Sequence, residues 1–101
     1  METKTLIVEA RARFNHNTAK AYLKDKYDSK LVVAEQGGLW KATPELISFL
    51  GIMTDEIVVV VDNFENPVSI FREELLASLN ETYVRVMKDW SAEWAELETK
   101  R

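Results

Sequence analysis

The last third of the chain decides the fold, since residues 67–97 read PVSIFREELLASLNETYVRVMKDWSAEWAEL. Apolar residues recur there every three or four positions, which is the spacing of one face of an α-helix. Pro67 follows Asn66, and an Asn cap followed by a proline in the first helical position is a common helix start. We therefore expect one long amphipathic helix from about residue 67 to residue 97.

The apolar stripe of this helix has a heptad-like spacing. Its main positions are Leu76, Leu79, Tyr83, Val86, Trp90 and Leu97, flanked by Leu75, Met87 and Trp94. Glu93 interrupts the repeat between Trp90 and Leu97. About 31 helical residues span roughly 46 Å, more than the roughly 33 Å diameter of a compact chain of this length. The end that carries the tryptophans therefore either overhangs the domain and needs a partner, or folds back through a break near Lys88 and Asp89.

The start of the chain alternates between apolar and polar residues. Residues 5–14 have this period of two, which predicts a strand with one face on a core. Residues 15–18, Asn-His-Asn-Thr, are good helix-capping residues, and the helical spacing that follows predicts a first helix over about 17–28.

The middle of the chain contains shorter elements. Residues 30–35 and 39–42 are strand-like and flank Gln-Gly-Gly, which predicts a tight hairpin because glycine accepts a positive φ. Thr43 and Pro44 open a short helix. Residues 56–62 form the strongest strand, and because that strand is apolar on both faces we expect both faces to be covered.

The expected order is strand, helix, strand, strand, helix, strand, helix. We interpret residues 1–101 as a single α+β domain. Its first six elements match the βαββαβ order of the ferredoxin-like fold, to which the long C-terminal helix is added.

Composition excludes several classes of protein. The 101 residues include no cysteine, which rules out disulfides and thiolate metal sites, and the net charge is −4. The longest apolar run, residues 57–61, is far shorter than the roughly 20 residues of a membrane helix. The first residues do not resemble a signal peptide. We therefore expect a cytoplasmic protein with no membrane partner.

No motif in the chain names a reaction. Neither a dinucleotide fingerprint nor a phosphate-binding loop is present. His16 is the only histidine and has no local residue to orient it as a base. The turn at 62–66 lacks the glycine and distal glutamate of a calcium loop. We expect a non-enzyme without cofactor or metal.

The leading hypothesis is a protein-interaction or oligomerisation module whose C-terminal helix forms the interface. We expect it to bind a second copy, most simply as a dimer, or another protein. The residues expected to form this interface are Tyr83, Val86, Met87, Trp90, Trp94 and Leu97.

Three alternatives remain open. The first is nucleic-acid binding by Arg11 and Arg13 on the predicted first strand with Trp40 and Lys41 on its neighbour, since aromatic and basic residues on a sheet hold bases; the acidic balance argues against it. The second is a viral or mobile-element accessory protein, because small acidic α+β chains of this kind occur there. The third is a small enzyme whose pocket between subunits unites carboxylates with His16.

Overall fold

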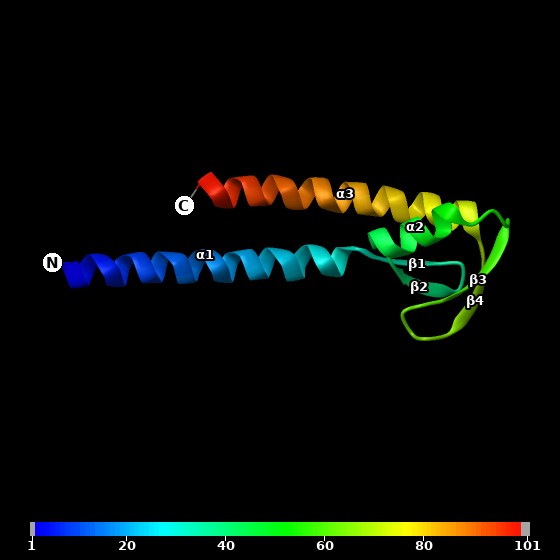
Figure 1. Cartoon of the computed structure of the whole chain (residues 1–101), viewed down its shortest axis with the longest axis horizontal. Coiled ribbons are helices and arrows are strands. Elements are labelled where there is room, and N and C mark those ends of the chain that lie inside the picture. The colour runs from blue at the N-terminus through cyan, green and yellow to red at the C-terminus, as the bar shows by residue number, and fades with distance from the viewer. Residues whose placement is uncertain (1, 100–101) are drawn as a thin grey trace.

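The computed structural model describes the backbone of residues 2–99 and the side chains of residues 15–99. Its elements are α1 (Glu2–Lys30), β1 (Val32–Glu35), β2 (Gly38–Lys41), α2 (Pro44–Ile52), β3 (Ile57–Val61), β4 (Pro67–Phe71) and α3 (Arg72–Thr99). The two long helices lie side by side and antiparallel, and all four strands gather at one end of them (Figure 1). The chain is therefore an α+β rod of 67 × 24 × 20 Å with a long C-terminal helix, as predicted.

The predicted first strand is wrong, because residues 5–14 belong to α1. The segment contains Ala10 and Ala12, and alanine is the best helix former. Both sheets lie at the opposite end of the rod, so this segment has no strand beside it (Figure 1). The ferredoxin-like order is consequently not observed. The strands form two separate antiparallel pairs, β1–β2 and β3–β4.

The long helix begins five residues later than predicted, since residues 67–71 form β4 rather than the first turns of α3. The cause is the turn before it. The Asp62 carboxylate accepts backbone N–H groups from Phe64 and Asn66, both at 3.0 Å, and Glu65 takes a positive φ of 63°. These bonds close a three-residue hairpin turn instead of capping a helix. The helix then continues to Thr99 without a break at Lys88 or Asp89.

The predicted β1–β2 hairpin is confirmed. Its two turn residues, Gln36 and Gly37, have positive φ angles of 51° and 79°, the mirror-image geometry that suits the twist of paired strands. Gly38 already belongs to β2, and a Cβ there would lie 2.6 Å from the Trp40 indole. The second predicted helix is also confirmed, with Thr43 Oγ1 capping it through Leu46 N at 3.2 Å.

The core lies where the hairpins meet α2 and the adjoining halves of the long helices. Its buried side chains are Leu23, Tyr27, Leu31, Trp40, Ala42, Leu50, Val58, Val60, Ile70, Leu75, Leu79 and Val86. This core is narrow for the length of the rod. The radius of gyration is 19.4 Å, against about 13 Å for a compact chain of 100 residues. An elongated chain of this size leaves apolar surface outside its core.

Candidate interaction surfaces

The predicted interface on α3 is partly covered within the chain. Val86 is buried in the core, and Tyr83, Met87, Trp90 and Leu97 are half-buried against it. The overhanging end of the helix thus has a partner within the chain. The α1 residues that make these contacts lie between residues 16 and 27, almost all within the predicted first helix, but nothing in the sequence indicated that this helix lies beside α3.

Glu93, the residue that interrupts the heptad, lies in the seam between α1 and α3. Its carboxylate accepts hydrogen bonds from the Lys26 ammonium and the Tyr27 hydroxyl. The bond from Lys26 lowers the pKa of Glu93, and the same bond raises the pKa of Lys26. The bond to the carboxylate raises the pKa of Tyr27 as well. One paired polar cluster in an apolar seam fixes the register of the two helices.

Two aromatic contacts position the tryptophans of α3. The rings of Tyr27 and Trp90 are nearly parallel, 10° apart, with centroids at 6.1 Å. The rings of His16 and Trp94 are tilted by 58° with centroids at 5.9 Å. Lys20 Nζ lies 5.7 Å from the centroid of the Trp94 ring, within the range of a cation–π interaction. Each indole is therefore held against α1.

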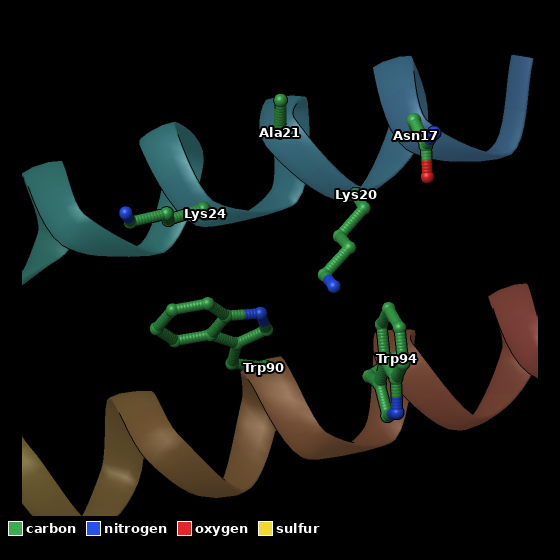
Figure 2. A pocket seen from close by; sticks show the side chains of 6 residues that line it. All are labelled: Asn17, Lys20, Ala21, Lys24, Trp90 and Trp94. Carbon is green, nitrogen blue, oxygen red and sulfur yellow. The ribbon is translucent and has the colours of Figure 1, made fainter. Parts of the chain in front are cut away.

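A groove of about 500 Å³ opens along these tryptophans. It is lined by Asn17, Lys20, Ala21 and Lys24 from α1 and by Trp90 and Trp94 from α3. Figure 2 shows Lys20 reaching from α1 toward the gap between the two indoles. The six lining residues include two cations and no carboxylate, so the groove has an apolar floor and a basic rim. We call it the tryptophan groove.

The second surface is the outer face of the β3–β4 hairpin. We predicted that both faces of β3 are covered, and this is wrong: Val58 and Val60 are buried, whereas Ile57, Val59 and Val61 are 53%, 66% and 62% exposed. Phe71 of β4, which pairs with Ile57, is also exposed on this face. The helices and the other hairpin cover one side of a two-stranded sheet, and nothing in the described chain covers the other.

The hydrogen-bond pattern shows which backbone groups of β3 are free. Arg72 N donates to Glu56 O and Asp62 N donates to Asn66 O, each at 2.9 Å, closing the two ends of the ladder. Because bonded pairs alternate in an antiparallel ladder, the even-numbered residues of β3 bond to β4. The odd-numbered residues direct their N–H and C=O groups away from β4, along an open edge.

The outer edge of β4 is closed by comparison. The Gln36 side chain donates Nε2–H to Phe71 O at 3.2 Å and accepts from Phe71 N at 2.7 Å, as a neighbouring strand would. Pro67 has no N–H to offer. An amide cap and an edge proline are devices by which proteins block strand pairing. The hairpin is therefore protected on one edge and open on the other.

The residues predicted for nucleic-acid binding do not come together. Trp40 is 1% exposed, and its Nε1–H donates to Glu35 O at 2.9 Å. Lys41 Nζ forms an ion pair with Asp28 at 2.8 Å. Arg11 and Arg13 belong to α1, in the half that lies farthest from the strands, and their side chains are outside the described part (Figure 1).

Candidate catalytic groups are also separate. Asp62 lies in the turn before β4, where Leu39, Phe64 and Asn66 donate backbone N–H groups to its carboxylate. These bonds, the one from Asn66 foremost, lower the pKa of Asp62. His16 lies against Trp94, in the helical part of the rod. Among the described residues no three His, Asp or Glu side chains are grouped to hold a metal, and no helix there is long and apolar enough to cross a membrane.

A comparison with family models, with curated proteins and with solved structures finds no match to this chain. The two surfaces of the chain, the tryptophan groove and the outer face of the β3–β4 hairpin, are its candidate interaction sites.

Proposed function

We propose that this chain is a non-enzymatic interaction module that self-associates through β3. The observation that carries the proposal is the combination of exposed side chains and free backbone groups on Ile57, Val59 and Val61. Residues 57–61 carry neither a charge nor a glycine or proline. An uncharged, β-branched edge strand pairs readily with other strands, so a soluble protein needs it covered.

A second copy of the chain fits this edge. Antiparallel pairing around a twofold axis at Val59 places Val59 beside its own symmetry copy and Ile57 beside Val61 of the other copy. All the free odd-numbered residues then form bonded pairs, which give about six main-chain hydrogen bonds. The axis stands perpendicular to the sheet, so the core face of each hairpin stays on the same side. The two pairs combine into one four-stranded sheet, which is more stable than two isolated hairpins.

The hydrogen bonds alone do not decide whether this dimer forms. Each contributes about 0.5–1.5 kcal/mol net, and association costs at least about 4 kcal/mol. The sum is near balance, so side-chain contacts along β3 determine the affinity. An apolar strand of three exposed β-branched residues supplies such contacts, with cross-strand pairs worth about 0.2–1 kcal/mol each.

Disulfide trapping tests the pairing, because the chain has no cysteine of its own. Under mild oxidation Val59→Cys is expected to form a covalent dimer rapidly. Ile57→Cys alone is not, since its copies would lie about 13 Å apart, beyond the reach of a disulfide. A mixture of Ile57→Cys and Val61→Cys chains is expected to cross-link as a heterodimer.

The matched control is Val84→Cys on α3, because Val84 is 64% exposed and lies outside the sheet. Cross-linking of Val59→Cys no faster than that of Val84→Cys would contradict pairing at β3. A wild-type chain that stays monomeric at millimolar concentration in sedimentation experiments would contradict self-association altogether.

A further inference from the structure

We infer that the tryptophan groove binds an amphipathic helix of a partner protein, with acidic residues along the edge of that helix. The groove lies between the long helices, away from β3, so this inference does not depend on self-association.

The shape of the groove suits a helix. Tyr83, Met87, Trp90 and Trp94 follow one another on α3 at spacings of four, three and four residues, and all four are half-buried. They form a straight apolar stripe of roughly 16 Å at 1.5 Å per residue. Two antiparallel helices leave a furrow between them into which a third helix packs at about 8–10 Å from each axis. About two to three turns of a partner helix would pack against this stripe.

Two side chains of α1 mark the edge of the groove. Ala21 lines it and is exposed, with its Cβ directed away from α3, whereas Lys20 reaches toward the gap between the indoles (Figure 2). A partner helix therefore lies against Trp90 and Trp94 beside the Lys20 side chain.

The two indoles are held in place before any partner arrives. Trp90 is stacked on Tyr27 and Trp94 rests against His16, so their positions are set by α1. Pre-positioned aromatic side chains lose little conformational freedom on binding. Tryptophan is also the residue type most enriched among those that dominate interface energies.

The lysines that line the groove predict that the partner is acidic. Lys20 and Lys24 are exposed, lie four residues apart on α1, and form no ion pair with a carboxylate of the described residues. Carboxylates at positions i and i+4 of a partner helix match this spacing. The chain as a whole has a net charge of −4, so these two lysines beside the tryptophans favour an acidic helix at this groove.

Two synthetic peptides test the inference on the full-length protein. Both carry leucines at i, i+3, i+4 and i+7 of a helix; one has glutamates along the edges and the other lysines. Titration calorimetry is expected to show the glutamate peptide binding about tenfold more tightly, as two partly exposed ion pairs allow. Equal affinity for both peptides, or no binding of either, would overturn the proposal.

Substitutions then locate the site. Trp94→Ala is expected to weaken the glutamate peptide at least about tenfold by removing one indole of the groove, as loss of one well-packed anchor does, whereas Ala92→Leu, at an exposed alanine on α3 outside the groove, is expected to leave it unchanged. The double variant Lys20→Gln with Lys24→Gln is expected to abolish the preference for the acidic peptide. Lys88→Gln serves as the matched charge control. Identical binding by Trp94→Ala and Ala92→Leu would refute the site, and a change in oligomer mass on Trp94→Ala would assign the groove to a second copy instead.

Discussion

Replacing Val59 by lysine tests the self-association of β3 most directly. Val59 lies at the centre of the open edge and is 66% exposed, so the change removes no contact from the core of the single chain. We expect Val59→Lys to unfold at nearly the same denaturant concentration as the wild type when both are monomeric. In the dimer the same side chain meets its own symmetry copy.

The size of the effect follows from exposure and symmetry. Complete burial of a valine is worth about 1.5–3 kcal/mol, so covering roughly half of the exposed part contributes about 1 kcal/mol per copy. A twofold interface counts this loss twice, giving about 2 kcal/mol. Two ammonium groups near the axis add about 1 kcal/mol of repulsion in water. The dimer should dissociate with a Kd about a hundredfold higher than that of the wild type.

Sedimentation velocity over a range of concentrations measures this Kd. Val84→Lys is the matched control, because Val84 has almost the same exposure on α3 and is expected to leave the dimer unchanged. Val59→Thr keeps the branched shape and should give an intermediate Kd, since only the apolar contact is lost. Equal Kd values for Val59→Lys and Val84→Lys would refute the assignment of the interface to β3.

Three further substitutions test the fold. The pKa of Glu93 is lowered in the folded chain, so its stabilising effect is complete above the unfolded pKa of about 4.3 and is lost as pH falls through the lower folded value. Glu93→Gln should therefore unfold more easily than wild type at pH 7, and the difference should shrink as the pH falls below the unfolded value; a constant difference across pH would contradict this. Leu79→Ala removes a fully buried side chain and should lower the free energy of unfolding by about 2–5 kcal/mol in urea titrations; a loss below about 1 kcal/mol would show that the site is not packed as described. Gly38→Ala places a Cβ 2.6 Å from the Trp40 indole and should cost about 1–3 kcal/mol, with a red shift of tryptophan fluorescence; unchanged emission would mean that the ring does not move.

Local chemistry explains which parts of the fold could be predicted from the sequence. The hairpin at residues 32–41 and the Thr43 cap depend on neighbouring residues alone, and both were predicted, although the positive φ angles fall on Gln36 and Gly37 and not on the two glycines. The C-terminal half of α3 also follows from its own apolar spacing. Residues 67–71 were predicted wrongly, because Asn66 and Pro67, a common helix start, here follow a hairpin turn that the Asp62 carboxylate closes.

The candidate surfaces depend on tertiary structure and were only partly predictable. The apolar spacing identified Trp90 and Trp94 as residues that need cover. The cover comes from the second half of α1, which was predicted to be helical but could not be placed beside α3 from sequence spacing alone. The apolar residues of β3 do not indicate that one of its faces is exposed. That face is exposed because β3 belongs to a sheet of only two strands, and the number of strands in a sheet cannot be read from the sequence of one strand.

Pairing at β3 leaves one further surface, the outer face of the combined sheet. The twofold axis keeps both core faces on one side, and the helices of each copy lie on that side, away from the outer face (Figure 1). Two dimers can therefore stack their outer faces at the usual spacing of about 10 Å between sheets. Phe71 lies on this face, and its backbone is already occupied by Gln36. Phe71→Lys should thus abolish a tetramer that forms at high concentration and leave the dimer intact, whereas Val59→Lys should abolish both. A tetramer that survives Phe71→Lys would place the second contact elsewhere, with the tryptophan groove as the next surface to test.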